Sequence, residues 1–400
     1  MLEASGALVA ELAADYPRPF ADPLGWQEGV IALCRQLPDH CRAAVGAVAV
    51  DGTSGTLLLS GADGCPLGPA LPYHQAFPDQ AQAAADLVGP SGQDLPAASA
   101  SGSLARALEL IDRYGVGGPE ALLRHQADWL SGWLLADWRW GEETNNLRLG
   151  WDQLEGRWLG QIAEQPWSAA LPELRPAGTR LGELAPSVAA LLGLPKTCVV
   201  VAGCTDASAA VLAADPQPGD GVTVLGTTLV LKQFSATPVQ GPGISCQRLA
   251  GRWLVGGASN AGAGVLRQFF ADALLPELSR QIDPRTSSGL ELRPLPRPGE
   301  RFPVDDPQLE PILEPRPVSD ALYLQGLLEG LSRIEAQGWA ALERQGAPPV
   351  SRVLSLGGGA RNPQWRAIRQ RILGVPVINR PQCTAALGMA RLALSALSQP

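Results

Sequence analysis

Asp206 is the residue of this sequence whose position most directly suggests chemistry. It follows a buried apolar run and precedes a segment of helical composition, in the stretch GCTDASAA. Open α/β sheets place their reactive groups at the carboxyl ends of strands, and a carboxylate there can accept a proton from a substrate hydroxyl. The same position also suits an aspartate that merely caps a helix. Asp206 alone therefore leaves general-base catalysis and helix capping open.

Three glycine-rich turns are candidate sites for binding phosphate. Gly226-Thr227-Thr228 joins two apolar β-type runs, so its hydroxyl and N–H groups could hold phosphate oxygens. Gly357-Gly358-Gly359 follows a predicted strand and precedes a predicted helix, whose positive end could face a nucleotide. The stretch GGASNAGAG (256–264) allows the same interpretation. Each turn could equally be an ordinary tight connection.

The common nucleotide-binding motifs are absent from the sequence. No G-x-x-x-x-G-K-[ST] occurs, and Lys196-Thr197 is preceded by Pro195, which excludes a P-loop. No G-x-G-x-x-G follows a first strand with an acidic residue downstream, so a dinucleotide-binding Rossmann domain is unsupported.

Composition restricts the class of protein. A chain of 400 residues that is 46% hydrophobic favours two domains. The net charge of −8 argues against a nucleic-acid partner or an anionic membrane, and no apolar run or signal-like N-terminus suggests a membrane or export. Seven scattered cysteines and three separated histidines indicate a reduced cytoplasmic protein, and no residue is assigned as a metal ligand.

The elements that must position these residues alternate between β and α patterns. In the first half we predict a strand at 6–17, a helix at 23–38, two strands within 43–60 and helical structure through 119–135. A buried strand at 199–201 should break at Gly203 and open a helix after Asp206. The turn cluster DPQPGDG (215–221) is the predicted domain boundary.

The second half repeats the alternation. Strands are predicted at 222–225, 229–234 and 253–256, followed by a glycine-rich helix start. A proline-rich stretch without regular elements runs from about 285 to 317, a long helix covers 320–346, and a strand, glycine turn and helix span 350–374. The whole pattern predicts an α/β protein with two mixed sheets, one in each of the domains 1–214 and 215–400.

Taken in order, these motifs resemble the FGGY carbohydrate kinases. Four motifs follow one another in the same order and with similar spacing as in that family. They are Asp206, a G-T-T hairpin about twenty residues later, GGASN and GGGARN. The resemblance extends over nearly the whole chain, through DGTSGT near residue 51, GERFP at 299–303 and AALGMARLA at the end. It is strongest to the cyanobacterial and plant-type pentulose kinases, which phosphorylate D-ribulose or D-xylulose.

The resemblance implies two ribonuclease H-like domains of the actin/hexokinase type, with ATP and sugar in an interdomain cleft and the last helix packing back on the first domain. It implies that Asp206 is the catalytic base and a substrate contact, and that Ser54 also contacts the sugar. ATP and Mg²⁺ are the implied cofactors, and the protein is expected to be a monomer or homodimer. The implied ATP-binding residues are Gly226, Thr227, Thr228, Gly262, Gly358, Gly359, Ala360, Arg361 and Asn362.

The sequence departs from the family pattern in two places. The family's first phosphate loop, D-x-G-T between its first two strands, is not found, and MLEASGALVAEL resembles the second strand entered halfway. We therefore expect the first strand and its loop to be encoded upstream of Met1. The second departure is Gln75, in PYHQAF (72–77), which stands where related kinases have a carboxylate. Sugar specificity is expected to depend on that change.

Three functions follow from these observations. The favoured one is an ATP- and Mg²⁺-dependent kinase of a pentulose or similar ketose. The first alternative is a non-catalytic protein that binds sugar or nucleotide and has lost the first phosphate loop. The second is an ATPase of the same fold without a sugar acceptor, which would have no need of a base such as Asp206.

Overall fold

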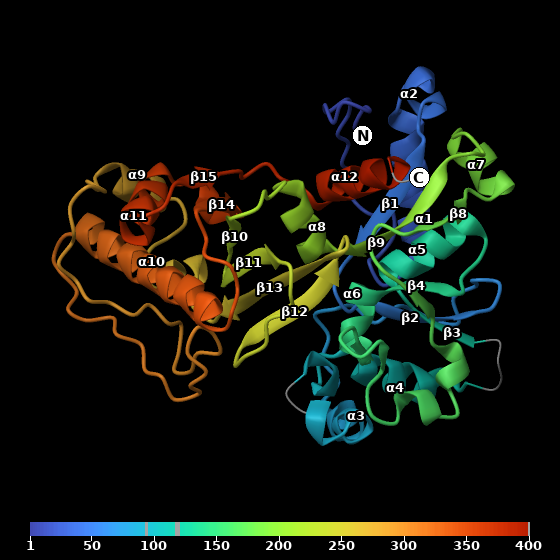
Figure 1. Ribbon diagram of the computed structural model, residues 1–400, viewed down its shortest axis with the longest axis horizontal. Helices are drawn as coiled ribbons and strands as arrows, with labels where there is room; N and C mark the ends of the chain where they lie inside the picture. The colour runs from blue at the N-terminus through green and yellow to red at the C-terminus, as the bar shows by residue number, and fades with distance from the viewer. Residues whose placement is uncertain (93–94, 117–120, 399–400) are drawn as a thin grey trace. The chain divides into compact units, whose positions relative to one another are not determined.

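The computed structural model describes residues 1–92, 95–116 and 121–398 (Figure 1). The chain forms two compact units. The first comprises residues 1–213, 248–251 and 384–400, and the second comprises residues 214–247 and 252–383. Among the helices of the described ranges, none has both the length and the apolar character that crossing a membrane requires.

The first unit carries most of the helices. Its helices are α1 (Pro23–Gln36), α2 (Asp39–Ala43), α3 (Ala81–Val88), α4 (Ser103–Tyr114), α5 (Gln126–Leu135), α6 (Glu143–Asn146), α7 (Pro186–Leu192), α8 (Asp206–Ala213) and α12 (Ala385–Leu397). Its strands are β1 (Ala47–Gly52), β2 (Leu57–Gly61), β3 (Ala121–His125), β4 (Trp140–Glu142), β5 (Trp151–Asp152), β6 (Arg157–Trp158), β7 (Glu173–Arg175), β8 (Arg180–Glu183) and β9 (Val199–Thr205).

The sheet β1-β9-β8 is the part of this unit that positions Asp206. Strands β1 and β9 are parallel, and β8 pairs antiparallel with β9, so the sheet is mixed. Helix α12 packs on α8 and β1 beside it. A Cβ added at Gly388 of α12 would lie 1.9 Å from the Ala209 carbonyl oxygen of α8, so a larger residue there would force the two helices apart.

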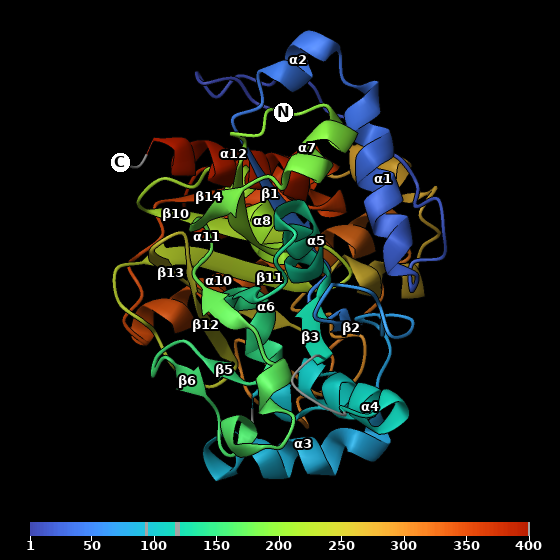
Figure 2. The same ribbon diagram turned by 90° about the vertical axis from the view of Figure 1, so that its right-hand side faces the viewer.

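A second part of the unit is built around the antiparallel strand pair β2–β3. Helices α3 and α4 lie side by side below this pair (Figure 2). Leu57 and Leu59 of β2 point into the same core as Leu104 of α4 and Leu123 of β3, and all four are at most 1% exposed. The small sheets β4–β7 and β5–β6 complete the unit.

The second unit is built on one six-stranded mixed sheet, ordered β12-β13-β11-β10-β14-β15. Strand β10 pairs antiparallel with β11 and parallel with β14. Helices α10 and α11 lie side by side against the sheet (Figure 1). The elements are β10 (Asp220–Leu225), β11 (Leu229–Ser235), β12 (Ile244–Leu249), β13 (Arg252–Ser259), α9 (Leu275–Arg280), α10 (Asp320–Arg344), β14 (Arg352–Leu356), α11 (Pro363–Leu373) and β15 (Val377–Asn379).

The sequence explains why α10 is the longest helix. Ser319 caps it by accepting a hydrogen bond from the Leu322 N–H at 3.3 Å. Leu324, Leu327, Leu328 and Leu331 follow at helical spacing and are at most 1% exposed. Burial of this leucine face against the sheet supplies most of the helix's stability.

A buried ion pair joins these two helices to the sheet. Glu335 of α10 and Arg369 of α11 form a bidentate pair at 2.6 and 2.7 Å, with side chains 1% and 0% exposed. Thr223 of β10 donates to Glu335 at 2.6 Å, and Arg369 donates to the Ser355 hydroxyl of β14, also at 2.6 Å. Because Thr223 and Ser355 are register partners, the pair lies over two adjacent strands.

We predict that Arg369→Met lowers the free energy of unfolding of the second unit by about 3–5 kcal/mol, because it leaves Glu335 buried and unpaired. The double variant Arg369→Met, Glu335→Leu should lose clearly less, since no charge remains in the core. Urea unfolding followed by circular dichroism measures both. Equal losses in the single and double variants would show that the unpaired charge is not the cause.

Several elements predicted from the sequence are confirmed. The predicted helices at 23–38 and 320–346 are α1 and α10, and the strand, turn and helix at 350–374 are β14 and α11 with a glycine turn between them. Residues 285–317, all of which the structure describes, contain isolated β-bridges and no helix or longer strand.

Other predictions are wrong, and the reasons lie in strand pairing. Residues 6–17 form no strand, because apart from a bridge between Leu2 and Leu8 the segment has no partner strand for its N–H and C=O groups. Residues 121–125, predicted as helix, form β3, because pairing with β2 prevails over their helical pattern.

Two further predicted boundaries are shifted. Strand β9 does not break at Gly203 but continues to Thr205. The predicted helix start at 256–264 belongs partly to β13, which extends to Ser259, and a 3-10 helix follows only at Ala263–Gln268. Strand β12 was not predicted at all.

Candidate functional site

The turn Gly226-Thr227-Thr228 is the tip of the β10–β11 hairpin. It follows the last cross-strand pair, Leu225 with Leu229, and is closed by a bond from the Gly226 N–H to the Thr228 carbonyl at 3.2 Å. Within the part of the chain that the structure describes, neither threonine has a hydrogen-bond partner for its hydroxyl or its N–H. The turn thus offers unpaired donors, which suit phosphate oxygens.

Gly262 and Gly264 support this turn from behind. A Cβ at Gly262 would lie 2.3 Å from the Thr227 carbonyl oxygen, and one at Gly264 would lie 2.6 Å from Thr227 Cγ2. The Gly264 N–H donates to the Thr227 carbonyl at 3.2 Å. A side chain at either position would collide with Thr227, so only glycine lets the 262–264 backbone pack directly against the turn. This contact fixes one side of the turn.

The segment 357–362 connects β14 to α11. Gly357 has φ +82°, a conformation that favours glycine, and a short 3-10 helix follows at Gly358–Arg361. Asn362 then caps α11 by accepting from the Trp365 N–H at 3.0 Å. Its side-chain amide donates to the Ser279 hydroxyl of α9 at 2.9 Å, which ties the turn to that helix.

A cavity of about 610 Å³ lies between the hairpin tip, the 357–362 segment and α9. Its wall combines apolar side chains such as Leu266 and Trp365 with the guanidinium groups of Arg267, Arg280 and Arg361. Arg267 is paired with Asp272, which also lines the cavity, and Arg280 is paired with Glu277. The apolar wall suits a flat base, and the unpaired donors of the hairpin tip suit anionic phosphates. The predicted residues that line it are Gly226, Thr227, Gly358, Gly359, Arg361 and Asn362.

The three other predicted ATP-binding residues adjoin the cavity without lining it. Thr228 is the second threonine of the hairpin tip, and Gly262 packs against that tip. Ala360 is 2% exposed and belongs to the core under the 357–362 segment.

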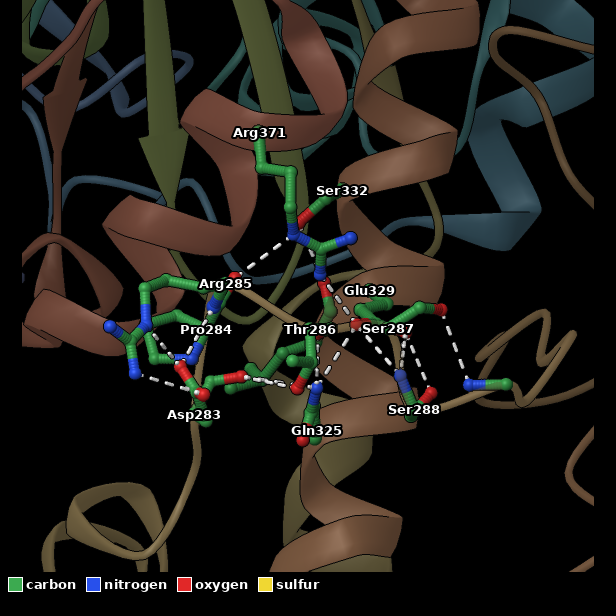
Figure 3. A network of polar contacts seen from close by, with 12 residues as sticks. Asp283, Pro284, Arg285, Thr286, Ser287, Ser288, Gln325, Glu329, Ser332 and Arg371 are labelled. Atoms are coloured by element: carbon green, nitrogen blue, oxygen red, sulfur yellow. Dashed lines mark hydrogen bonds and ion pairs between the residues drawn. The ribbon is translucent and has the colours of Figure 1, made fainter.

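Helix α9 forms one wall of the cavity. A polar network holds the segment 283–288, which follows this helix (Figure 3). The buried Glu329 of α10 accepts from Arg371 of α11 at 2.6 Å and from the Ser288 hydroxyl at 2.6 Å. Arg371 also donates to the Pro284 carbonyl at 2.9 Å. Burial raises the pKa of Glu329, but these hydrogen bonds outweigh it and hold the pKa below its usual value. The carboxylate therefore stays charged and holds the 284–288 segment that follows α9.

The structure separates two roles among the glycines of the 357–359 turn. A Cβ at Gly359 would lie 2.5 Å from the Trp365 ring, whereas one at Gly358 meets nothing within 4 Å. We expect Gly358→Val to fold normally and to weaken ATP binding about tenfold or more, because its side chain enters the cavity.

The matched control is Gly359→Val, which should lower the melting temperature because it collides with Trp365. Calorimetry with ATP and thermal unfolding separate the two effects. Unchanged ATP affinity in folded Gly358→Val would show that the nucleotide does not occupy this cavity.

Asp206 is the first residue of α8, directly after β9 in the first unit. Burial raises the pKa of its half-buried carboxyl, and the N–H groups of Ala207 and Ser54 and the charge of Arg148 act in the opposite sense. The Ala207 N–H lies 2.7 Å from Asp206 Oδ1. Helix α8 is capped by the preceding residue, Thr205, whose hydroxyl accepts a hydrogen bond from the Ser208 N–H at 3.4 Å. The side chain of Asp206 is therefore an accessible carboxylate and not the cap of the helix.

Ser54 lies in the 53–56 loop, which passes over Asp206. The structure brings these two predicted substrate-binding residues together, since the Ser54 N–H is close enough to the Asp206 carboxylate to lower its pKa. Thr53 fixes the loop: its N–H and hydroxyl both donate to Gln126 Oε1 at 3.0 Å. The loop is thus held rigidly at the carboxyl ends of β1 and β9.

Gln75, where the family has a carboxylate, is exposed, and its segment is held by a buried arginine. Arg106 is 0% exposed and donates to the carbonyls of Pro72 at 3.1 Å, Tyr73 at 2.5 Å and Gln75 at 2.6 Å. Burial and, to a smaller extent, the nearby charge of Arg148 lower the pKa of Arg106 to about 10. The backbone of 72–75 is therefore fixed through its carbonyl groups.

Asp51, the last residue but one of β1, is a site residue that the sequence analysis did not assign. Burial raises the pKa of its carboxyl to about 6, its own N–H lowers it, and the charge of Asp206 raises it. The only signal for it in the sequence was the acidic residue that opens DGTSGT. Its nearness to Asp206 depends on the pairing of β1 with β9.

We predict that Asp51→Asn raises the free energy of unfolding at pH 7 by about 3 kcal/mol, because the carboxyl pKa is raised from 3.8 to about 6. The folded-state pKa of about 6 exceeds the unfolded value, so wild-type stability falls as pH rises from about 4 to about 6. The gain in the variant should therefore disappear below about pH 4, where Asp51 is protonated in both states.

The exposed Asp86 of α3 provides the control, since Asp86→Asn removes a charge without relieving burial. Urea unfolding at pH 4, 5.5 and 7 measures all three proteins. Equal stability of wild type and Asp51→Asn at pH 7 would contradict the prediction.

In residues 1–92, 95–116 and 121–398, no group of three or more His, Cys, Asp or Glu side chains is arranged to hold a metal ion. Mg²⁺ commonly enters such sites bound to substrate phosphates, with few protein ligands. The donor set is thus compatible with Mg²⁺ that arrives with ATP.

A protein-family model matches most of the second half of the chain. Residues 221–397 match the model of the C-terminal domain of the FGGY family of carbohydrate kinases. The matched range contains the hairpin tip, the 357–362 segment and every residue that lines the cavity. The predicted resemblance is confirmed for this domain.

Solved structures match nearly the whole chain. It is similar to a "xyloylose kinase" from Brucella ovis (20% identity, TM-score 0.79, covering 100% of this chain and 88% of that one). A xylulose kinase from Rhodospirillum rubrum (22%, 0.78, covering 96% and 83%) is also similar. So is a gluconate kinase from Lactobacillus acidophilus (16%, 0.74, covering 99% and 86%). These matches confirm the predicted fold, two ribonuclease H-like α/β domains, and the matched proteins are carbohydrate kinases.

Proposed function

We propose that this chain, whose residues 221–397 match the C-terminal domain of the FGGY family of carbohydrate kinases, is an ATP-dependent sugar kinase. The observation that carries the proposal is the cavity of about 610 Å³ in the second unit. Six of the nine residues that the sequence resemblance assigns to ATP line it, although they come from separate turns. If the β10–β11 turn had only a structural role, it would not need threonines with unpaired hydrogen-bond donors at its tip.

Asp206 supplies the second part of the proposal. Phosphoryl transfer needs a positioned acceptor hydroxyl and neutralised phosphate charge more than covalent chemistry. A half-buried carboxylate at the carboxyl end of β9 can take the proton of that hydroxyl as the bond to phosphorus forms. The Ser54 loop beside it would contact the sugar.

We propose a pentulose such as D-ribulose or D-xylulose as the acceptor. Two of the similar structures are named as kinases of xylulose or a similarly named sugar, which supports a ketose of this size. The sequence resemblance to D-ribulose and D-xylulose kinases points the same way. Both partners of the protein are then small molecules, and the reaction takes place in the cytoplasm.

ATP and Mg²⁺ are the proposed cofactors. The threonine hydroxyls and N–H groups at the hairpin tip would hold phosphate oxygens, and the wall around Trp365 would receive the adenosine. Mg²⁺ would neutralise phosphate charge when bound.

We expect Asp206→Asn to lower sugar phosphorylation by about 10²–10⁴-fold, because an amide keeps the shape but cannot accept the proton. ATP affinity, measured by calorimetry, should be unchanged. A coupled assay of ADP release with D-ribulose and D-xylulose measures the activity.

Two outcomes would contradict parts of this proposal. Wild-type turnover in Asp206→Asn would exclude Asp206 as the general base. Sugar binding without ADP release in the wild-type protein would instead favour a non-catalytic binding protein.

A further inference from the structure

Asp51 and Asp206 lie at the carboxyl ends of two adjacent parallel strands. Asp51 of β1 is the register partner of Cys204 of β9, and the next pair is Gly52 with Thr205, directly before Asp206. Parallel strands deliver their carboxyl ends to the same edge of a sheet, which is where ligands of open α/β sheets bind. The two carboxylates therefore face one region of the first unit.

A β-bulge produces this register. Between two register pairs, Ala49 with Val201 and Asp51 with Cys204, strand β9 contributes one residue more than β1. A Cβ at Gly203 would lie 1.8 Å from the Val50 carbonyl oxygen, so the bulge requires glycine there. Bulges re-aim side chains and are common next to active sites. Without the extra residue, Asp51 would pair with position 203.

The Asp51 carboxylate is poorly supplied with donors. In the part of the chain that the structure describes, the hydrogen bond it receives comes from its own N–H. The neighbouring Thr53 hydroxyl is directed to Gln126 Oε1 at 3.0 Å and lies 2.6 Å from the Thr56 hydroxyl. An ionised carboxylate accepts about four hydrogen bonds, so most of the capacity of Asp51 is unused.

The groups that face this carboxylate do not neutralise it. Asp206 adds negative charge, and the Cys204 thiol and Tyr16 hydroxyl have pKa values raised by burial and by the charge of Asp51. Gln126 directs its amide to the Tyr16 oxygen, at 3.4 Å. Arg148 acts on Asp206. The half-buried Asp51 carboxylate therefore has few hydrogen-bond donors within the protein. A bound molecule could provide the missing donors.

On the basis of the proposed kinase function, we propose that Asp51 binds the sugar by accepting a hydrogen bond from the hydroxyl next to the one that Asp206 deprotonates. The substrate class is then a neutral sugar or polyol with two adjacent hydroxyls. Each hydroxyl donates to one carboxylate, so a vicinal diol bridges the two aspartates and orients the reacting oxygen.

Acidic sugars are disfavoured by the same arrangement. An aldonate would bring a third carboxylate near Asp51 and Asp206, and like charges at short range repel. A ketose such as D-ribulose or D-xylulose carries no charge and presents a vicinal diol. Asp51 thus acts as a specificity-determining residue beside the catalytic base.

The test compares wild type, Asp51→Asn and the exposed control Asp86→Asn. Calorimetry without ATP measures the Kd for D-ribulose, D-xylulose and gluconate, and ADP release measures kcat and KM. We expect Asp51→Asn to raise Kd and KM for the ketose about 10- to 100-fold, because a charge-assisted hydrogen bond is lost. The relative affinity for gluconate should rise, and Asp86→Asn should match the wild type.

The pH dependence provides a second readout. Wild-type ketose affinity should fall as pH drops below about 6, where Asp51 becomes protonated, and this step should be absent in Asp51→Asn. The neighbouring Asp206, Tyr16 and Cys204 are present in both proteins, so only Asp51 differs. The same step in both proteins would overturn the assignment.

The outcomes separate this inference from the proposed function. Ketose turnover with the same Kd and KM in Asp51→Asn would overturn the inference and leave the kinase function standing. Ketose binding without turnover would overturn the kinase function, while the Kd ratio still decides the role of Asp51. An unchanged ketose Kd with an altered Mg²⁺ requirement would assign Asp51 to a cation instead and reject the inference. Absence of any sugar binding by the wild type would reject both.

Discussion

The ion pair between Glu335 and Arg369 is the interaction on which the second unit depends. It lies in the core and connects α10 and α11 to adjacent strands through Thr223 and Ser355. A pair so deeply buried adds little net stability compared with apolar residues of the same volume. Its effect is on position: the bidentate geometry allows only one placement of α11 over β14, and the 357–362 segment between them is placed with it.

Both units present their functional groups at the ends of strands that are fixed elsewhere. In the second unit, the hairpin tip is fixed by Gly262 and Gly264, and the 357–362 segment by Asn362 and α11. In the first, the 53–56 loop is fixed by Gln126. Buried polar groups that are fully paired hold one conformation, so the exposed donors and carboxylates need no rearrangement to meet a ligand.

The first unit concentrates negative charge where stability alone would exclude it. Burial raises the pKa of Asp51 to about 6, with Asp206 contributing, so keeping the Asp51 carboxylate charged at neutral pH opposes folding. Active sites commonly retain such unfavourable groups because ligand binding requires them. A diol that donates to both carboxylates would relieve part of this strain, which couples sugar binding to the stability of the unit.

The sequence by itself determined the local features of this protein, namely single helices, turns and the residues next to them. The leucine periodicity of α10, the glycine turn before α11, the G-T-T hairpin and the carboxylate after β9 were predictable because each depends on residues close in the chain. The tertiary structure decided the rest. Residues 121–125 form the strand β3 and not the predicted helix because they pair with β2, which is distant in the chain. Strand β9 continues past Gly203 because it pairs with β1. The role of Asp51 was likewise decided by strand pairing, because its donors, its burial and its distance from Asp206 all depend on which strand lies beside it.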